Sequence, residues 1–527
     1  MNAPATNLTA DLAALRQIAG NEAVSDDLAL RTLYSQDIWR EGAAVGAAVA
    51  TPTSLENLSQ IVAEAGARKF AIAIRGGGMS YTAGYVAESD RTLILDLSAL
   101  NQVVEINAAN MTVTVQAGCT WKTLYEALKP LGLRTPFWGP LSGIWSTIGG
   151  GLSQLNAIFG AGQYGTTSES VVGLKVVLAD GSILTTGAAG RGNAPFYRHY
   201  GPDLTGLFCG DCGVFGVKAE ITLRLMRLPG QEGYLSFAFA DGGKMMLAGA
   251  EIARSGVSAE LVGFDPTLAE VRLRRASILS GVKAMGAVVA QGKSLLGGLG
   301  DALKIAVAGR GFLEASEYSL HLIVEGRTKA GVEADLAEIR HIVSGLAGRE
   351  TEPSIPKVLR AQPFTPLNNI LGPDGERWVP VHGIVALSDA EPCFNAVNAL
   401  FDGYKARFDA MGIYTGLMLT SLSTNAFLIE PVFFWPEARL PIHDHTVEPS
   451  MLAKLKTHAP NPEATALVAE ARKAAIDVFQ RFGAAHFQIG RTYPWLASRD
   501  PASQALVQAI KAALDPERRM NPGGLGL

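Results

Sequence analysis

Short apolar runs and helical stretches alternate through the first half of the chain. The runs "KFAIAI", "TLILDL", "QVVEI" and "MTVTVQ", between residues 69 and 116, have the length and alternation typical of β-strands. Residues 54–68 and 120–133 instead repeat apolar positions every three or four residues, and Ser54 can cap the first of them. The pattern therefore predicts helices at these two places, among the strands.

A change of pattern near Pro229 divides the chain. Before it, the apolar runs at 171–178 and 182–186 are joined by "ADG", which predicts a β-hairpin. After it, residues 235–480 alternate strand-like runs with longer helical stretches, as in an α+β domain with a mostly antiparallel sheet. We expect four parts: a lead-in (1–44), a first domain (45–230), a second domain (231–480) and a C-terminal segment (481–527).

Composition narrows the class of protein. The chain of 527 residues is too long for one ordinary core, and its 48% apolar and 18% charged residues indicate a globular protein. A net charge of −4 without a long basic run disfavours nucleic-acid binding. Neither a signal-peptide pattern nor an apolar segment of the ~20 residues needed to span a membrane is found, so we expect a cytoplasmic protein.

Residues 276–313 stand apart because Ala, Gly, Leu and Val dominate them and Lys is scattered among them. Such a stripe is typical of one or two buried helices of the second domain. The alternative is a lid, or a surface that contacts a membrane or a quinone, which would place the protein at the periphery of the inner membrane. A homo-oligomer is also expected.

Two glycine clusters carry the clearest chemical signal. "IRGGGMSY" (74–81) follows a predicted strand, and its backbone N–H groups can converge on an anion such as a pyrophosphate. It lacks the G-x-G-x-x-G and P-loop patterns. "STIGGGLSQLN" (146–156), about 70 residues later, adds hydroxyl and amide groups. Two such loops indicate one long cofactor lying across the first domain.

These motifs, taken in order, resemble a known family. "AIRGGGMSY", "VTVQAGCTWKTLYEAL", "STIGGGLSQ", "YGTTSESVVGLKVVLADG", "LFCGDCGVFGVKAEITLRL" and "ALDPERRMNPGGLGL" are similar to the vanillyl-alcohol oxidase/p-cresol methylhydroxylase (PCMH) superfamily, which includes FAD-dependent D-lactate and glycolate dehydrogenases. The resemblance covers residues 45–230 and 483–527. It implies an α+β fold with a PCMH-type, two-subdomain FAD-binding domain, a substrate-binding cap domain at 231–480, and a C-terminal segment that returns to the flavin.

The resemblance also assigns FAD-binding residues. They come from six places: the first pyrophosphate loop, the turn before the 120–133 helix, the second loop, the nucleotide end, the strand beside the ring system and the C-terminal "NPG". They are Arg75, Gly76, Gly77, Gly78, Met79, Ser80, Gly118, Pro140, Thr147, Gly149, Gly150, Gly151, Ser153, Asn156, Tyr164, Gly165, Gly216, Val217, Glu220 and Asn521. The His and Cys that attach flavin covalently in some members are missing from these loops, so noncovalent FAD is expected; attachment from the cap stays open.

The predicted substrate side lies first in "GAAHFQIGRTYPW" (483–495). It resembles the D-lactate dehydrogenase branch at His486 and the vanillyl-alcohol oxidase branch at Arg491, although Ala485 and Gly490 depart from them. His486 is a candidate general base, and Arg491 a candidate clamp for a carboxylate or phenolate. Alternatively, His486 packs in a strand and Arg491 belongs to a structural ion pair.

"IEPVFFWPEARLPIHDH" is the second candidate, because Glu430, His443 and His445 lie within it. Glu430 and His443 are candidate catalytic residues that point into the active site from the cap. The three side chains could instead bind a divalent metal, but the His-rich pattern of the D-lactate branch is missing and no metal is expected. Cys209 and Cys212 form a C-x-x-C, which is interpreted as a pair of loop thiols rather than a redox disulfide.

These observations predict an FAD-dependent oxidoreductase that transfers a hydride from a small alcohol to flavin N5. The first hypothesis is a 2-hydroxy acid such as D-lactate as substrate. The alternative is a para-substituted phenol or aryl alcohol, which "YGPDLTGLF" (200–208) and "GRT" favour. A third hypothesis, a binding protein without flavin, is disfavoured by the intact glycine loops. The electron acceptor, whether O₂, a quinone or a carrier protein, stays open.

Overall fold

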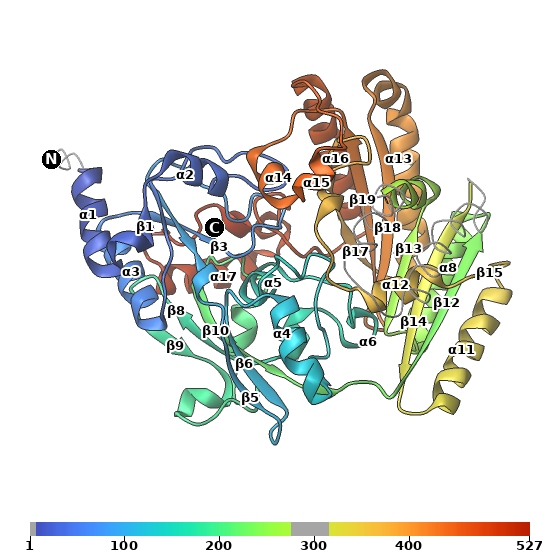
Figure 1. Ribbon diagram of the computed structural model, residues 1–527, viewed down its shortest axis with the longest axis horizontal. Coiled ribbons are helices and arrows are strands. Elements are labelled where there is room, and N and C mark those ends of the chain that lie inside the picture. The colour runs from blue at the N-terminus through green and yellow to red at the C-terminus, as the bar shows by residue number, and fades with distance from the viewer. Residues whose placement is uncertain (1–6, 276–315) are drawn as a thin grey trace, which may run out of the picture.

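The structure is a computed structural model that describes residues 7–275 and 316–527. Figure 1 shows strands and helices of the first half of the chain on the left and the largest sheet on the right. The C-terminal residues, in red, return to the left-hand part. The architecture is α+β, as predicted from the sequence.

Residues 7–230, the part expected to bind FAD, are called the FAD-binding half below; their first sheet has four strands in the order β1-β2-β4-β3. Its central pairs are parallel, and β1 joins antiparallel from the lead-in. The strands are β1 (Val24–Ser25), β2 (Ala48–Ala50), β3 (Ala71–Arg75) and β4 (Thr92–Asp96). Helix α3 (Leu55–Ala67) precedes β3, and the Ser54 hydroxyl caps it by accepting a hydrogen bond from the Asn57 amide at 3.1 Å. The capped helix predicted at 54–68 is therefore confirmed.

The second sheet of this half has five antiparallel strands in the order β5-β6-β10-β8-β9. They are β5 (Val103–Asn107), β6 (Thr112–Gln116), β8 (Val171–Val177), β9 (Ile183–Thr185) and β10 (Val217–Arg224). The predicted hairpin appears as β8 and β9. The remaining short elements are α4 (Trp121–Leu128), β7 (Leu133–Arg134), α5 (Ile148–Gln154), α6 (Ala161–Tyr164), α7 (Leu204–Leu207) and β11 (Met226–Arg227).

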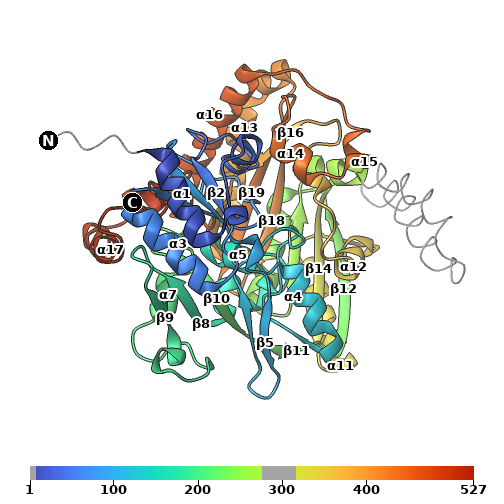
Figure 2. The same ribbon diagram turned by 60° about the vertical axis from the view of Figure 1, so that its left-hand side comes forward.

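Both ends of the described chain pack on this half. Helices α1 (Leu8–Ala19) and α2 (Leu28–Tyr34) come from the lead-in, and α17 (Pro501–Leu514) lies beside the FAD-binding half in both ribbon views (Figures 1 and 2). The Ile72 amide donates to the Arg519 carbonyl at 2.8 Å, and the Asn521 amide donates to the Ile72 carbonyl at 2.8 Å. The C-terminal segment thus extends the edge of the first sheet at β3.

The second domain is built on an eight-stranded sheet in the order β15-β12-β14-β13-β18-β19-β16, with β17 also paired to β19. Every strand pair is antiparallel. The strands are β12 (Gln231–Phe239), β13 (Glu260–Phe264), β14 (Tyr318–Gly326), β15 (Arg349–Thr351), β16 (Arg377–Pro380), β17 (Gly383–Ala386), β18 (Tyr414–Leu422) and β19 (Ala426–Trp435). The expected antiparallel cap sheet is confirmed.

The two faces of the cap sheet have different chemistry. One face packs its Leu and Phe side chains, such as Leu322 and Phe427, against helices. The covering helices are α8 (Gly242–Ser255), α11 (Lys329–Ser344), α13 (Ala390–Met411) and α16 (Pro462–Arg481). Because neighbouring residues of a strand point to opposite faces, Glu260, His321 and Glu430 face the FAD-binding half. The sheet therefore supplies polar groups to the space between the two domains.

A buried ionic cluster joins the domains at this face. Arg134 of β7 pairs with Glu325 of β14, and Arg360 of α12 (Ser354–Ala361) pairs with Glu325 at 2.8 Å and with Glu260 at 2.6 Å. The Glu260 side chain also accepts a hydrogen bond from the Gly160 amide at 2.8 Å. Each buried carboxylate therefore has a cationic partner, and the cluster connects α12, the cap sheet and the FAD-binding half.

We expect Arg360→Met to destabilise the protein by about 3–5 kcal/mol, because it leaves buried carboxylates without their cation. The measurement is urea-induced unfolding followed by circular dichroism. The matched control is Arg340→Met, because Arg340 pairs with Glu350 at an exposed site and an exposed pair contributes about 0–1 kcal/mol. Equal stability of the two variants would contradict a supporting role for the buried cluster.

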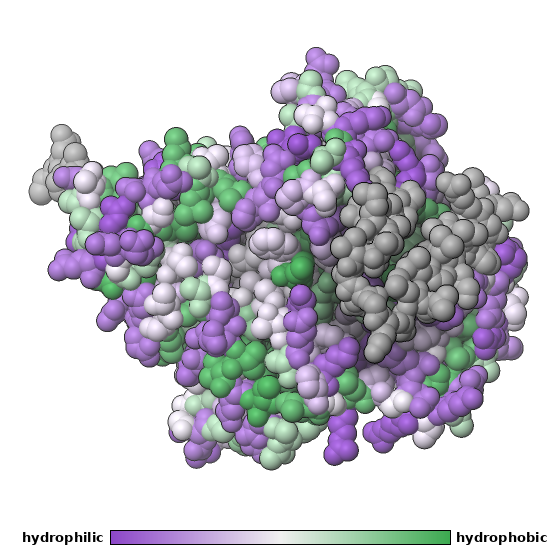
Figure 3. Space-filling model, viewed as in Figure 1, coloured by the Kyte–Doolittle hydropathy of each residue, from purple (hydrophilic) through white to green (hydrophobic). Residues whose placement is uncertain are grey.

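Hydrophilic residues are spread over much of the face shown in Figure 3, and hydrophobic residues gather below its centre. Within residues 7–275 and 316–527, the structure contains no helix with the length and apolarity of a membrane span. The segment 276–313, for which a membrane or quinone surface was considered, lies outside the described residues. Peripheral membrane contact and a homo-oligomer stay predictions.

Candidate functional site

A cavity of about 230 Å³ lies between the glycine loops and the cap sheet. The loops at 76–81 and 146–158 line it on one side. Strands β16, β18 and β19 and the helical residues 266–275 line it on the other. Polar and aromatic groups of the cap side are Arg272, Arg275, Trp378, Met418, Thr420 and Glu430. Both predicted glycine loops therefore open into one space.

The first loop begins where β3 ends. Arg75 is held outside the cavity, because its guanidinium lies over the rings of Tyr34 and Tyr85 and donates to the Gln36 carbonyl at 3.3 Å. The amides of the residues that follow, 76–79, have no hydrogen-bond partner among the residues that the structure describes. Gly78 has a positive φ of 69°, which favours glycine. The loop thus presents free amides to the cavity.

The second loop approaches the first at backbone distance. Thr147 caps the N-terminus of α5, because its hydroxyl accepts a hydrogen bond from the Gly150 amide at 3.1 Å. A Cβ placed on Gly77 would overlap the carbonyl oxygen of Trp145, so the two loops pack without side chains between them. Free amides, hydroxyls and glycine surfaces on one wall fit the diphosphate of FAD.

The structure divides the predicted FAD ligands into two groups. Those that line the cavity are Gly76, Gly77, Gly78, Met79, Ser80, Pro140, Thr147, Gly149, Gly150, Gly151, Ser153, Asn156 and Gly216. Those that do not line it are Arg75, Gly118, Tyr164, Gly165, Val217, Glu220 and Asn521. Direct FAD contact stays a prediction for both groups, and the second group has structural contacts of its own.

Two residues of the second group show those contacts clearly. Glu220 forms an ion pair with Lys175 on the neighbouring strand at 2.8 Å. The Asn521 amide group donates to the carbonyls of Gly84 and Cys212, at 2.7 and 2.6 Å. Asn521 therefore connects the loop after β3 to the loop before β10, and it supports the cavity wall from behind.

Glu430 is the predicted catalytic residue that the structure places in the cavity. Burial raises the pKa of its carboxyl group to about 7, although a hydrogen bond from Tyr81 and the charge of Arg272 oppose the shift. The Tyr81 hydroxyl donates to Glu430 Oε2 at 3.4 Å and accepts from Gln488 Nε2 at 3.1 Å. Near neutral pH, Glu430 can therefore exchange a proton with a bound molecule.

Two arginines reach the same cavity from residues 266–275, which begin where Asp265 Oδ1 accepts a hydrogen bond from the Leu268 amide. Arg272 and Arg275 are three residues apart and so lie on one face of the helix. Burial lowers the pKa of each to about 10, so both remain cationic at neutral pH. Neither forms an ion pair within residues 7–275 and 316–527. Two cations that have no carboxylate in an ion pair among these described residues favour an anionic ligand.

The other predicted catalytic residues do not line the cavity. His486 stacks on Tyr493, with ring centroids 4.1 Å apart, and its Nδ1 contacts the His382 carbonyl at 2.7 Å. Arg491 donates to main-chain carbonyls, among them that of Pro522 at 2.7 Å. The Leu440 amide donates to His443 Nδ1 at 2.9 Å, inside α14 (Pro441–Thr446). Catalytic roles for these residues stay predictions without support from the cavity.

Sequence reasoning missed Tyr81, Arg272, Arg275, Trp378 and Gln488. Tyr81 ends the quoted "IRGGGMSY", so its position after the loop was a usable signal. The spacing of Arg272 and Arg275 was visible in "EVRLRRAS", but charged residues at helical spacing usually mark a solvated face. Trp378 and Gln488 carried no local signal, because tertiary packing alone brings them to the cavity.

The remaining candidates are the metal ligands considered at Glu430, His443 and His445 and the cysteines of the C-x-x-C. His445 lies at the surface beside Trp145, and the described residues hold no group of three or more potential metal ligands. All four cysteines are free thiols, and burial raises the pKa of Cys209 and of Cys212 to about 12. Cys212 lines the cavity, and its sulfur accepts a hydrogen bond from the Gly490 amide at 3.3 Å. The interpretation as loop thiols agrees with these contacts.

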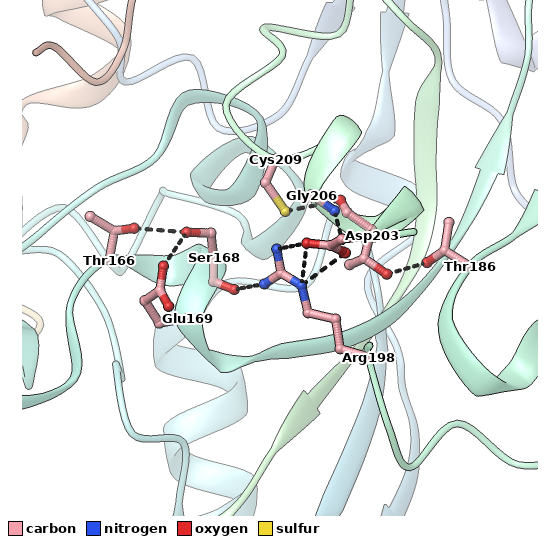
Figure 4. Close-up of polar contacts among 9 residues, drawn as sticks. Thr166, Ser168, Glu169, Thr186, Arg198, Asp203, Gly206 and Cys209 are labelled. Atoms are coloured by element: carbon pink, nitrogen blue, oxygen red, sulfur yellow. Dashed lines mark hydrogen bonds and ion pairs between the residues drawn. The ribbon is translucent and has the colours of Figure 1, made fainter. Parts of the chain in front are cut away.

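Figure 4 shows how the run at 200–208 is anchored. The Arg198 guanidinium binds the Asp203 carboxylate at 2.8 Å and the Ser168 carbonyl at 2.6 Å. The Cys209 thiol points back to the Thr205 carbonyl at 3.2 Å. This run does not line the cavity. The cavity therefore adds no support from this run to the phenol alternative, which stays a prediction.

Comparisons with known proteins agree with this architecture. A family model described as an FAD binding domain matches residues 46–187. The chain is 32% identical over 215 residues to glycolate oxidase subunit GlcD of Bacillus subtilis (strain 168). It is also 32% identical over 219 residues to the "Probable D-lactate dehydrogenase, mitochondrial" of Danio rerio. Each match covers 41% of this chain, and they span only 44% and 43% of the two relatives.

Solved structures extend the likeness in fold to the whole chain. A crystal structure of p-cresol methylhydroxylase with substrate bound superposes with a TM-score of 0.74 at 18% sequence identity. The superposition covers 98% of this chain and 96% of that one. Together with the FAD binding domain match, it confirms the PCMH-type fold expected from the glycine motifs.

Proposed function

We propose that this chain, which has a match to an FAD binding domain and a PCMH-type fold, is an FAD-linked oxidoreductase that oxidises the hydroxyl-bearing carbon of a small 2-hydroxy acid. The similarity to a glycolate oxidase subunit and a D-lactate dehydrogenase supports the alcohol chemistry. Arg272 and Arg275 in the cavity support a substrate with a carboxylate group. Oxidation would give the 2-oxo acid.

The residues of the cavity divide the work. When bound, FAD supplies an acceptor for the hydride that leaves the carbinol carbon. Arg272 and Arg275 would bind the substrate carboxylate, and Glu430 would take the hydroxyl proton on its carboxylate. Glu430 Oε2 accepts from Tyr81, which leaves Oε1 without a partner among the described residues. The Tyr81 ring packs edge-on against Trp378, with centroids 5.7 Å apart, and fixes the Glu430 contact.

One observation carries the proposal. Glu430, a carboxyl group with a pKa of about 7, shares the cavity with two arginines that form no ion pair within the described residues. A 2-hydroxy acid needs a base for its hydroxyl proton and a cation for its carboxylate. The cavity supplies both next to the glycine loops.

The test is anaerobic reduction of the purified flavoprotein by a panel of D- and L-2-hydroxy acids and para-substituted phenols, followed by loss of visible flavin absorbance. We expect bleaching by one enantiomer of a 2-hydroxy acid and none by phenols. Bleaching by phenols alone would contradict the proposal. Release of the yellow cofactor on acid precipitation would test the expected noncovalent attachment.

We expect Arg272→Met to raise the KM for the 2-hydroxy acid about 10- to 100-fold and to change kcat little, because it removes a charged hydrogen bond to the substrate carboxylate. Steady-state kinetics measure both constants. Arg274→Met is the matched control, since Arg274 lies on the same helix but pairs with Asp374 at 2.6 Å at an exposed site. An unchanged KM in the Arg272 variant would exclude this carboxylate contact.

A para-substituted phenol is the second candidate substrate. The aromatic side chains of Tyr81, Trp378 and Phe487 line the cavity and could enclose a ring. Arg272 and Arg275 could stabilise a phenolate as they would a carboxylate. The same panel separates the candidates, because a phenol needs no 2-hydroxy group for flavin reduction.

A further inference from the structure

A second, smaller cavity of about 30 Å³ adjoins the first behind Arg272. The two share Leu141, Ile158 and Arg272 in their linings. We call the smaller cavity the annex. Its remaining apolar lining comes from β13, β14 and α12, and consists of Val262, Phe264, Ile323, Ile355, Pro356 and Leu359. The cation that would bind the substrate carboxylate therefore stands between the reaction site and an apolar space.

Apart from Arg272, which both cavities share, the polar groups of the annex carry no unpaired charge. His321 lies between Ser236 and Ser319, and burial lowers its pKa to about 3, so it is neutral. Both carboxylate oxygens of Glu260 are bonded, one to the Gly160 amide and the other to Arg360. The Arg272 guanidinium lies over the Phe264 ring, 4.3 Å from its centroid, and Arg272 lines both cavities. Beyond Arg272, which the substrate carboxylate would occupy, a charged group would find no partner in the annex, whereas an alkyl group would bury apolar surface.

We propose that the annex binds an aliphatic side chain of the substrate, so that the preferred 2-hydroxy acid carries a chain longer than the methyl group of lactate. The cavity volume limits this chain to a short alkyl group, because about 30 Å³ accommodates only one or two small groups. Met418, whose sulfur lies 3.7 Å from Arg272 Nη2, lines the reaction cavity beside Arg272 and can adapt its shape to an alkyl chain. That the substrate is a 2-hydroxy acid rests on the proposed function, whereas the alkyl chain is inferred from the annex alone.

The experiment measures binding apart from turnover. Unreactive straight-chain carboxylates from acetate to octanoate are titrated into the FAD-loaded protein, and dissociation constants are taken from the perturbed flavin spectrum. Each methylene that the annex buries should tighten binding about 4-fold, until the chain fills the space. Dissociation constants that do not change with chain length would overturn the proposal.

Two variants of α12 locate the effect. Leu359→Trp should fill the annex and abolish the gain for hexanoate, while it leaves the acetate constant within about 2-fold. Leu359→Ala should enlarge the annex and move the optimum to a longer chain. Val358→Trp is the control, because Val358 is the next residue on the helix, is exposed and does not line the annex. The same chain-length dependence in Leu359→Trp, Leu359→Ala and Val358→Trp would refute the annex as the binding site.

Flavin reduction by 2-hydroxy acids of the same lengths separates this inference from the proposed function. Graded binding of carboxylates without reduction by any 2-hydroxy acid would support the annex and overturn the proposed chemistry. Reduction by D-lactate or its enantiomer with no gain from longer chains would support the chemistry and overturn the annex. Reduction that becomes more efficient with chain length, and loses this gain in Leu359→Trp, would support both.

Discussion

Glu430→Gln should slow flavin reduction by the 2-hydroxy acid by about 10²- to 10⁴-fold, the contribution of a positioned general base. Glutamine keeps the shape of the side chain and a hydrogen-bond acceptor for Tyr81, but it cannot take a proton. Because the pKa of Glu430 is about 7, the carboxylate is the minor form below that pH and the major form above it. The wild-type rate should therefore rise as the pH passes through 7, and this rise should disappear in the variant. Stopped-flow reduction between pH 5 and 9 measures both effects.

Glu260 provides the control for this experiment. It is another buried carboxyl group on the same face of the cap sheet, and burial raises its pKa as well. Glu260 does not line the reaction cavity, so the rise in rate with pH should persist in the Glu260→Gln variant. If Glu430→Gln kept the wild-type pH profile, Glu430 would not be the base.

Gly77→Ala should weaken FAD binding about 100-fold or more. The new Cβ would overlap the Trp145 carbonyl oxygen, so the two loops would have to move apart. We expect this separation to cost about 3 kcal/mol, the upper end of the range typical of overpacking. Their separation would move the free amides away from the diphosphate. Titration of the apoprotein with FAD, followed by quenching of flavin fluorescence, gives the dissociation constant.

Gly403→Ala is the matched substitution for this test. Gly403 lies within α13, and a Cβ there meets no atom within 4 Å. Alanine in an exposed helix should leave FAD binding unchanged and stabilise the helix by up to about 1 kcal/mol. Wild-type FAD affinity in Gly77→Ala would show that the close approach of the two loops is not needed for binding.

The sequence predicted those parts of the site that depend on local backbone. A glycine loop after a strand has a short-range signature, and both loops, from Gly76 and from Thr147, line the cavity as expected. The antiparallel cap sheet was likewise visible in the alternation of strand-like runs with longer helical stretches over residues 235–480. Local patterns sufficed here because each of these elements is specified within about ten residues.

The substrate side could not be predicted in the same way. Tyr81, Arg272 and Glu430 come from a loop, a helix and a strand that are far apart in sequence, and only the fold brings them to one cavity. His486 and Arg491 were chosen from a local likeness. In the structure, His486 contacts the His382 carbonyl and stacks on the Tyr493 ring. Arg491 donates to main-chain carbonyls such as that of Pro522. A motif supplies residue types, whereas packing decides which way they point.

The hydrogen bonds of Asn521 have a consequence for biosynthesis. They connect the carbonyls of Gly84 and Cys212, and Asn521 is translated more than 300 positions after Cys212. The contacts that hold these two loops together therefore form only near the end of synthesis. While the ribosome still holds residue 521, the nascent chain lacks this clamp. FAD capture should therefore follow synthesis of the cap domain rather than accompany the emergence of the glycine loops.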